Sequence, residues 1–426
     1  MGKKWGNNDH FLKEKNSFAY TGRRGILSLL FLVGILISVT GCGVKDPVAN
    51  VMVVSDIHYI SPRINDNGEM FQSLINERDG RAMLYIEEIT DSFVDEVIEN
   101  KPEALIVTGD LTFNGAIESH EDLAEKFARI EENGIDVLVL PGNHDVYSGN
   151  AARFMGESFE RVESPDTGRF IELYKDYGYS EALEKDENSA SYIYEVNDSL
   201  RVLMLDFNTY DAYSDISKDT LEWTEKVLKQ AKKDGVYVLA CGHQNILTHH
   251  KLFMFGYVIA RTDELTKIFE KYGVKVFLSG HLHTQHYATK GKVTEILTSA
   301  LPLYPNHYGK LNFFDGVMDY EAVGTKIDAP GYEEYAIESF ERMSNPTKLS
   351  LKESSLTKEE QKRVADFFTF TNFCYYSGDM VSYSKSTERD EIKELWDKSG
   401  LGYRPYLELI EEDSGKDFKH LRVKLK

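Results

Sequence analysis

The sequence predicts an α/β fold that is organised around a largely parallel β-sheet. Short apolar runs alternate with longer stretches in which apolar residues recur at helical spacing, and this rhythm is typical of strand–helix–strand units. Five of the runs have the length and composition of buried strands: Val51–Val54, Ala104–Val107, Val137–Leu140, Val236–Ala240 and Val274–Leu278. The 426 residues are 42% hydrophobic and 28% charged, which is typical of a soluble globular protein with a sizeable core.

The first half of the sequence shows the rhythm most clearly. After the first strand, residues 59–80 form a polar loop. Residues 82–100 carry apolar side chains at helical spacing, which predicts an amphipathic helix over Ala82–Asn100. A second helix, Glu118–Asn133, ends at Gly134 and joins the second strand to the third. We therefore expect the first three strands to lie parallel.

The second half of the sequence repeats the pattern after an interruption. Residues 147–188 show no strand pattern and are predicted to be an insertion with helical segments around Ala151–Phe159 and Arg169–Tyr177. The remaining elements are a hairpin, two helices that precede the fourth and fifth strands, and two closing strand-rich stretches: Ala190–Val196, Leu200–Leu205, Ser217–Lys233, Thr262–Tyr272, Lys292–Thr298 and Gly316–Lys326. A second strand–helix–strand half is thus expected to follow the first.

The composition changes after Pro330. Residues 331–426 contain no clear strand, and three charged segments have helical character: Tyr332–Met343, Thr357–Phe368 and Ser386–Lys398. We expect a catalytic domain over residues 42–330 and a helical C-terminal subdomain over residues 331–426. No motif in this subdomain points to chemistry, so its expected role is packing or shaping the cleft.

The N-terminal sequence predicts that the protein is located outside the cytoplasm. Basic residues up to Arg24 precede the apolar stretch Ile26–Val39, which is shorter than the about 20 residues that a membrane-spanning helix needs. The next residues, Thr40-Gly41-Cys42, complete a sequence that resembles a bacterial lipobox. This resemblance implies that residues 1–41 are a signal peptide and that Cys42 carries a lipid that holds the protein at the cell membrane. An uncleaved anchor with an incidental cysteine is the alternative.

Charge and cysteine content restrict the partners. The net charge of −21 argues against binding to a nucleic-acid duplex, which requires a positive surface. If Cys42 is lipidated, Cys241 and Cys374 remain. Cys241 lies in an apolar run and is expected to be a small buried hydrophobe. A bridge between these two cysteines stays open at this stage.

Polar residues of the kinds that bind metal ions follow each of the five strands. The five stretches are Asp56-Ile57-His58, Gly109-Asp110, Gly142-Asn143-His144-Asp145, Gly242-His243 and Gly280-His281-Leu282-His283. The carboxyl ends of parallel strands meet at one edge of a sheet, so oxygen and nitrogen ligands gather there as a two-metal hydrolytic site requires. We expect Gly280, which follows the fifth strand, to bend the backbone there and let both following imidazoles reach one centre.

Together the five stretches resemble the calcineurin-like metallophosphoesterase family, whose pattern is D-x-H, G-D, G-N-H-[DE], G-H and G-H-x-H in that order. The match runs across residues 51–300 and leaves the C-terminal region unexplained. It implies a four-layer α/β/β/α sandwich and a metal-dependent phosphoric ester hydrolase. The stretch Glu295–Ala300, followed by Tyr304-Pro305, also resembles the branch that includes bacterial cyclic-nucleotide phosphodiesterases.

The resemblance implies a role for each ligand of a dinuclear centre. Asp110 would bridge two divalent ions, which Mn, Fe, Zn or Ni could provide. One ion would be completed by Asp56, His58 and His283, and the other by Asn143, His243 and His281. A water opposite the bridging carboxylate would become the attacking hydroxide.

Other residues are candidates beyond the metal ligands. In the family, the residue at the position of His144 donates a proton to the leaving group or stabilises phosphoryl charge. Asp145 either orients that imidazole or serves as an N-cap or turn residue. His249 and His250 either line the substrate mouth or belong to a mobile surface loop, and His286 is solvated or lies behind the ligands. Five more residues at strand ends contact substrate or simply pack: Asn114, Tyr147, Asn208, Tyr210 and Tyr304.

The functional prediction is hydrolysis of a small phosphodiester, with a cyclic nucleotide as one candidate, by a hydroxide that bridges two metal ions. The first alternative is a phosphomonoesterase or lipid pyrophosphatase at the membrane surface. The second is a surface protein that binds a ligand without turnover. The complete ligand set and His144 disfavour this second alternative, because a binding protein needs neither a second metal ion nor a proton donor.

Overall fold

Three parallel strands form one half of the first β-sheet in the computed structural model, which describes residues 47–76, 80–402 and 404–426. The predicted signal peptide and Cys42 lie outside the described residues. The sheet has the order β17 (His420–Lys424), β16 (Val317–Gly324), β15 (His307–Phe314), β1 (Ala49–Val54), β2 (Ala104–Val107) and β3 (Asp136–Val139). The strands β1, β2 and β3 are parallel, and β15, β16 and β17 extend the sheet in antiparallel fashion.

The second sheet contains the other predicted parallel strands. Its order is β13 (His286–Lys290), β14 (Val293–Leu297), β12 (Val276–Ser279), β11 (Tyr237–Gly242), β8 (Leu200–Leu205), β7 (Tyr192–Asn197) and β6 (Glu184–Lys185). The strands β8, β11, β12 and β14 are parallel, while β6, β7 and β13 are antiparallel neighbours. The sequence did not predict β13 or β15. Both strands are partly polar, and each pairs with an antiparallel neighbour. Their formation therefore depends more on this pairing than on their amino-acid composition.

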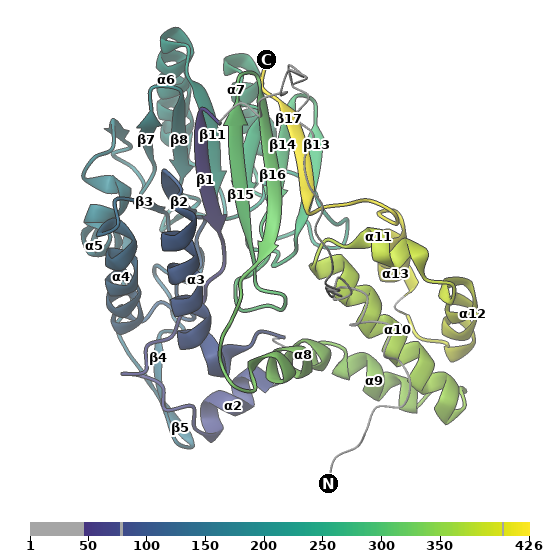
Figure 1. Ribbon diagram of the computed structural model, residues 1–426. Coiled ribbons are helices and arrows are strands. Elements are labelled where there is room, and N and C mark those ends of the chain that lie inside the picture. Colours follow the sequence, from purple (N-terminus) through teal and green to yellow (C-terminus); the bar gives the residue numbers. More distant parts are fainter. Residues whose placement is uncertain (1–46, 77–79, 403) are drawn as a thin grey trace, which may run out of the picture. The chain divides into compact units, whose positions relative to one another are not determined.

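Alternation along the second sheet explains how the layers stack. On β8, Val202 and Met204 face the core shared with the first sheet, whereas Leu203 and Leu205 face the helices α6 (Lys218–Asp234) and α7 (Thr262–Tyr272). Helices α3 (Ile86–Asn100) and α4 (Ile117–Glu131) pack beside the strands β1 to β3 (Figure 1). Both faces of the inner strands, such as β2 and β12, are therefore covered, which is why these strands are almost continuously apolar. The predicted four-layer α/β/β/α architecture is confirmed.

The region between the third strand and the predicted hairpin contains more structure than expected. The predicted helix around Ala151–Phe159 is wrong, because residues there form a hairpin of β4 (Ala152–Met155) and β5 (Ser158–Arg161). Gly156 turns with a positive φ of 57°, and the ring of Phe154 packs 5.5 Å from that of Phe71. This tertiary contact overrides local helix propensity. Phe71 lies on α2 (Glu69–Asn76), a helix inside the stretch predicted to be a polar loop. The segment ends with α5 (Thr167–Leu173) and the helical turn Lys175–Tyr179.

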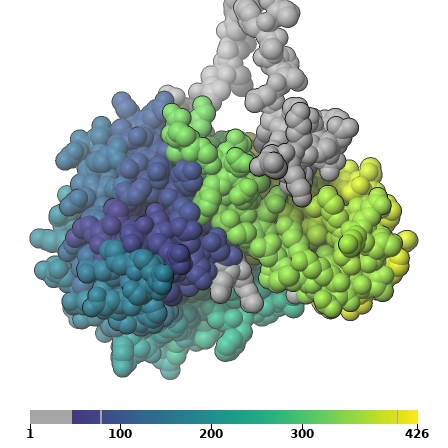
Figure 2. All heavy atoms as spheres, turned by 90° about the horizontal axis from the view of Figure 1, so that it is seen from below, coloured from purple at the N-terminus to yellow at the C-terminus, as the bar shows by residue number. Residues whose placement is uncertain are grey.

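The C-terminal region is mostly helical, as expected. Its helices are α8 (Tyr332–Arg342), α9 (Asn345–Lys352), α10 (Lys358–Tyr376), α11 (Met380–Lys385), α12 (Arg389–Ser399) and α13 (Arg404–Glu411). They bury a core of their own, with the ring of Phe368 stacked 5.5 Å from that of Trp396. In the view from below, the atoms of this region are light green to yellow, and the first half is purple to teal (Figure 2).

The expectation that residues 331–426 contain no strand is wrong at the end of the chain. Residues 420–424 form β17, which pairs with β16 and returns the chain to the first sheet. Its side chains alternate between exposed and half-buried. A short polar edge strand of this kind forms because it pairs with a neighbouring strand, and not because its residues are apolar. The described residues belong to one compact unit, so the domain boundary at residue 330 stays a prediction.

Smaller elements complete the fold. The turn η1 (Met83–Tyr85) precedes α3, and β9 (Asn208–Thr209) pairs with β10 (Ala212–Tyr213) in a short hairpin. Cys241 and Cys374 are both free and buried, so the bridge left open by the sequence does not form. Within the described part of the chain, no helix has the length and apolar character needed to cross a membrane.

Candidate active site

The predicted ligands gather where the parallel strands of both sheets end. Asp56 and His58 follow β1, Asp110 follows β2, and Asn143 follows β3. From the second sheet, His243 follows β11, and His281 and His283 follow β12. Since the two sheets pack face to face, loops that are far apart in sequence meet at one place. The structure therefore brings all seven predicted ligands together.

The backbone at this place is unusual. The residues with positive φ include Asp56 (51°), His58 (51°), Asp110 (48°), His281 (67°) and His283 (56°). Non-glycine residues adopt this left-handed conformation rarely, and it is concentrated at functional sites. It turns each side chain away from its strand direction and toward the shared centre.

The expected role of Gly280 is wrong in one respect. The bend lies at the two histidines themselves, and Gly280 is instead required by close approach. A Cβ atom at this position would lie 1.7 Å from the Ser55 hydroxyl and 2.3 Å from an oxygen of Asp56. The glycine thus allows the loop after β12 to touch the loop after β1.

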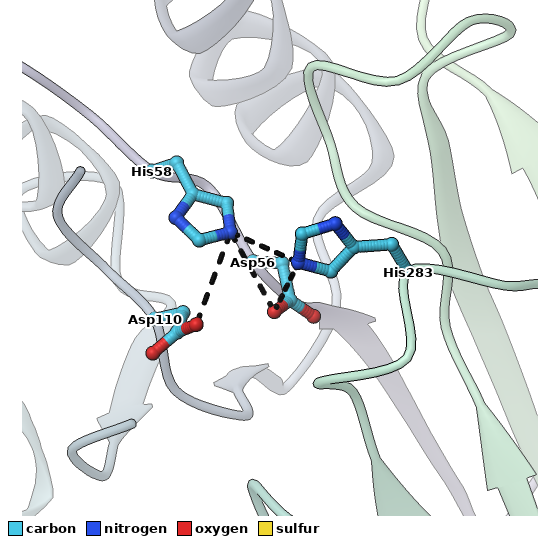
Figure 3. Close-up of side chains that lie close together, drawn as sticks. All are labelled: Asp56, His58, Asp110 and His283. Atoms are coloured by element: carbon cyan, nitrogen blue, oxygen red, sulfur yellow. Dashed lines mark hydrogen bonds and ion pairs between the residues drawn. The ribbon is translucent and has the colours of Figure 1, made fainter. Parts of the chain in front are cut away.

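The first ligand group consists of Asp56, His58, Asp110 and His283 (Figure 3). The Nε2 atom of His58 lies 3.8 Å from Asp56 Oδ1, 3.9 Å from Asp110 Oδ2 and 3.1 Å from His283 Nε2. His283 Nε2 is also 3.2 Å from Asp56 Oδ1. Two carboxylates and two imidazoles therefore point their free electron pairs at one small volume.

The second ligand group consists of Asp110, His243 and His281, with Asn143 beside it. His243 Nε2 is 3.3 Å from Asp110 Oδ2, 3.2 Å from His281 Nδ1 and 3.0 Å from the Asn143 side-chain oxygen. Asp110 belongs to both groups, so the two sets of ligand atoms share its carboxylate.

Backbone carbonyls orient two of these imidazoles. His243 Nδ1 donates a hydrogen bond to the Thr108 carbonyl (2.9 Å), and His281 Nε2 donates one to the Gly256 carbonyl (3.0 Å). Each bond leaves the other ring nitrogen free and directed into the site. This is how proteins fix the tautomer and the direction of a metal-binding histidine.

The electrostatics of the site favour a cation. Burial alone would raise the pKa of the Asp110 carboxyl, but the imidazoles of His243, His144 and His58 outweigh burial and hold this pKa well below its usual value. Burial lowers the pKa of His243, but the adjacent Asp110 carboxylate outweighs burial and raises this pKa to about 9, so a proton and a metal ion compete for Nε2. The carboxylate thus stays ionised and attracts positive charge.

Two other ligands are held neutral. Burial lowers the pKa of His58 well below its usual value, and the charge of Arg81 lowers it further. Burial and the charge of His243 lower the pKa of His281 to about 4. Neutral imidazoles are the form that binds metal ions.

An unpartnered polar atom shows that the residues fit a metal ion. Within the described residues, the buried oxygen Asp56 Oδ1, which faces the first ligand group, has no hydrogen-bond partner. A buried carboxylate oxygen without a partner is costly, and a divalent cation in the first ligand group would compensate it. The mixture of carboxylate, imidazole and amide ligands suits the divalent transition metals.

His144 lies beside the ligand groups and outside them. Its Nδ1 atom donates a hydrogen bond to the Phe113 carbonyl (2.7 Å), which leaves Nε2 free and 3.9 Å from Asp110 Oδ2. Its ring lies 5.0 Å from that of His58, and its side chain is 38% exposed. A partly exposed imidazole next to the ligand groups has the position that a proton donor to bound substrate requires.

Asp145 does not contact the His144 imidazole through any hydrogen bond found among the described residues. Its carboxylate is fully buried and accepts hydrogen bonds from the backbone N–H groups of Leu111, Thr112 and Gly142. Of the two roles weighed for it, the turn role is the one that the structure supports. The predicted catalytic role of Asp145 is thus limited to holding the loops after β2 and β3 together.

The remaining candidates have mixed outcomes. The side chains of His249 and His250 are buried, although the loop that carries them continues into the exposed Phe255, and His286 is buried and not solvated. Asn114 and Asn208 are buried and donate hydrogen bonds to the carbonyls of Ala152 and Pro141, as packing residues do. The exposed rings of Tyr147 and Tyr210 lie 5.6 Å apart, whereas Tyr304 packs on Phe373.

Sequence reasoning missed three side chains near the site. Arg81 is buried and its charge acts on His58, and the ring of Tyr257 lies 5.1 Å from that of His281. Burial raises the pKa of Tyr213, and the charge of Asp110 raises it further. None of them follows a parallel strand or lies in a motif. Only the folded structure could place them.

The sequence matches the family described as calcineurin-like phosphoesterase over residues 49–285 of the 426. The match covers more than half of the chain and contains all seven predicted ligands. The chain therefore belongs to the calcineurin-like phosphoesterase family, and it is a metal-dependent phosphoric ester hydrolase. No curated protein matches the sequence.

Solved structures with a similar fold include phosphatases. A dimetal phosphatase from Danio rerio is 14% identical, with 66% of this chain and 98% of that chain covered and a TM-score of 0.49. A purple acid phosphatase from yellow lupin is 14% identical, with 66% and 52% covered and a TM-score of 0.44. A putative 5'-nucleotidase from Staphylococcus aureus is also 14% identical, with 68% and 57% covered and a TM-score of 0.39. At these values the likenesses say nothing about the substrate.

Proposed function

We propose that the enzyme hydrolyses a small phosphodiester with two divalent ions held by the two ligand groups. The observation that carries this proposal is the position of Asp110, whose carboxylate belongs to both groups. A single ion would need only one of them. The preference for a diester rests on the resemblance of residues 295–305 to cyclic-nucleotide phosphodiesterases.

The side chains of the site have distinct tasks in such a reaction. Asp56, His58 and His283 would hold one ion, Asn143, His243 and His281 the other, and Asp110 both. When bound, two divalent ions supply a water-derived nucleophile at neutral pH and neutralise charge on the phosphoryl oxygens. The carbonyls of Thr108 and Gly256 keep the imidazoles of His243 and His281 aimed while this happens.

His144 would complete the site by acting on the leaving group. Its free Nε2 atom can carry the proton that the departing alkoxide needs, because Nδ1 is held by the Phe113 carbonyl. The same nitrogen can donate to a phosphoryl oxygen while charge develops there. A group with either task has to be accessible to substrate, and the exposure of His144 meets this requirement.

The first test is a substrate screen. With Mn²⁺ added, we expect the purified protein to bind two ions and to cleave bis-p-nitrophenyl phosphate faster than p-nitrophenyl phosphate, and cyclic nucleotides are assayed next. Faster cleavage of the monoester, or of a lipid pyrophosphate, would replace the diester proposal by a phosphomonoesterase or lipid pyrophosphatase. If the protein binds two ions but cleaves none of these esters, the result would favour a protein that binds a ligand without turnover.

The second test concerns location. We propose that the protein is lipid-anchored on the outer side of the cell membrane through Cys42, which lies outside the described residues. Cys42→Ala should release the protein from the membrane fraction or leave it unprocessed, and metabolic labelling with a fatty acid should disappear. Cys374→Ala, which removes a buried thiol, serves as the control and should leave the label unchanged. Wild-type protein found in the cytoplasm with residues 1–41 intact would disprove the anchor.

A further inference from the structure

A chain of ionisable side chains, buried except for its half-buried last member, runs from the site to the C-terminal helices, and the proposed reaction does not use it. Its members are Glu295 on β14, His249 in the loop after β11, His286 on β13 and Asp413 after α13. Glu295 is 0% exposed within an apolar strand. A buried carboxylate is costly unless hydrogen bonds compensate it, so its contacts indicate what it does.

Glu295 links the loops that carry the second ligand group. Its Oε1 atom accepts hydrogen bonds from the Ser279 hydroxyl (2.6 Å) and the Ile246 N–H (2.9 Å), and its Oε2 atom accepts one from the Leu247 N–H (2.5 Å). Ser279 ends the strand that leads to His281, and Ile246 lies three residues after His243. One carboxylate thus holds the backbone behind both imidazoles.

Asn245 strengthens the same link. Its side-chain amide donates to the Gly280 carbonyl (3.1 Å), and its backbone N–H donates to the Tyr257 carbonyl (2.9 Å). Tyr257 follows Gly256, whose carbonyl orients His281. The loop over residues 243–258 therefore supplies one ligand directly and fixes the direction of another.

The chain continues from Glu295 to the C-terminal region. His249 Nε2 lies 3.2 Å from Glu295 Oε2, within ion-pair distance but without forming a hydrogen bond, and the Nδ1 atoms of His249 and His286 are hydrogen-bonded 2.9 Å apart. Burial lowers the pKa of His286 to about 4, so its ring is neutral and carries one proton. That proton lies on Nε2, which donates to Asp413 (3.3 Å), and His286 Nδ1 therefore accepts from His249.

Groups from the surrounding elements complete this environment. Phe418 stacks on His286 with ring centroids 3.9 Å apart, and Lys416 pairs with the other oxygen of Asp413 (2.7 Å). The ring of Tyr375 lies 6.4 Å from that of His286. Residues of the C-terminal region thus enclose the outer end of the chain. His286 lies at this end and follows the ligand His283 by three residues.

We propose that Glu295 is a positioning residue for the second metal ion, and that His249, His286 and Asp413 extend this support to the C-terminal helices. The inference rests on the proposed two-metal function and assigns residues 331–426 a part in it. The first ligand group has no contact with Glu295 among the interactions of the described residues. The effect of Glu295 should therefore be selective for one ion.

The test measures Mn²⁺ binding to the full chain by titration and electron paramagnetic resonance, without any substrate. In Glu295→Gln the NH2 of the side-chain amide, which cannot accept a hydrogen bond, would face a backbone N–H donor. The loop after His243 should therefore shift. We expect the second ion to bind about 10–100-fold more weakly, the usual cost of losing support behind a metal ligand, and the first ion to bind as in the wild type. The spectrum of the one-ion state should match that of His281→Ala.

Two further variants keep the test decisive. Glu295→Asp retains the charge and should recover part of the affinity, which loss of folding stability alone would not predict. His286→Phe keeps the ring on Phe418 but breaks the chain, and should weaken the second ion selectively even if Glu295→Gln fails to fold. Glu412→Gln is the matched control, because it neutralises the neighbouring carboxylate, which forms an exposed pair with Lys251 (2.9 Å).

The outcomes separate this inference from the proposed function. A wild-type protein that binds fewer than two ions would disprove the two-metal function. The other case is a wild-type protein that binds two ions. If Glu295→Gln and His286→Phe then weaken both ions equally, or leave the binding of both unchanged, only the positioning role would be disproved.

Discussion

His144→Ala should keep both metal ions bound and lower turnover by about 10²–10⁴-fold, the usual contribution of a positioned proton donor or oxyanion partner. The structure places this imidazole beside the two ligand groups and outside both of them. The loss should be smaller for p-nitrophenyl esters than for alkyl esters, because p-nitrophenolate leaves without needing a proton. Steady-state rates on both kinds of ester, with metal content from elemental analysis, measure this.

Two comparisons make the result interpretable. His281→Ala should lose metal and activity on every substrate, and His420→Ala, which removes an exposed imidazole on β17, should behave as the wild type. Equal impairment of His144→Ala on good and poor leaving groups would exclude proton donation and favour stabilisation of phosphoryl charge. Loss of metal from His144→Ala would make it a ligand and require a new assignment of the whole site.

Asp110→Asn should lower the occupancy of both metal sites and abolish most of the activity. Its carboxylate belongs to both ligand groups, and a neutral amide bridges two cations poorly. Loss of a group behind a metal ligand typically costs about 10–100-fold in affinity or activity, so loss of a shared ligand should cost more. Elemental analysis after dialysis, together with turnover at saturating Mn²⁺, measures both effects.

The matched control is Asp263→Asn, which makes the same chemical change at an exposed position on α7. It should retain two ions and full activity. The assignment of Asp110 as the bridging ligand fails if Asp110→Asn still holds two ions after dialysis. The Asp110 carboxylate also accepts a hydrogen bond from the backbone N–H of His144 (2.8 Å). The folding of the variant is therefore checked by circular dichroism and thermal unfolding.

The sequence predicted the inner strands well and the outer elements poorly. Strands such as β2 and β12 are buried on both faces, so their apolar composition alone identifies them. The hairpin of β4 and β5 and the edge strand β17 lack this signal. Their residues suit more than one conformation, and contacts with distant parts of the chain decide between them.

By itself, the sequence determined the family, the α/β class and the seven residues that gather at the strand ends. These follow from short motifs, because a ligand must have a suitable side chain and must follow a parallel strand. Only the tertiary structure decided that His281 and His283 carry the bend, that Asp145 holds loops together, and that Glu295 and His286 join the C-terminal helices to the site. Such roles depend on distant partners, such as Asp413, which lies 127 residues after His286, and the local sequence carries no record of them.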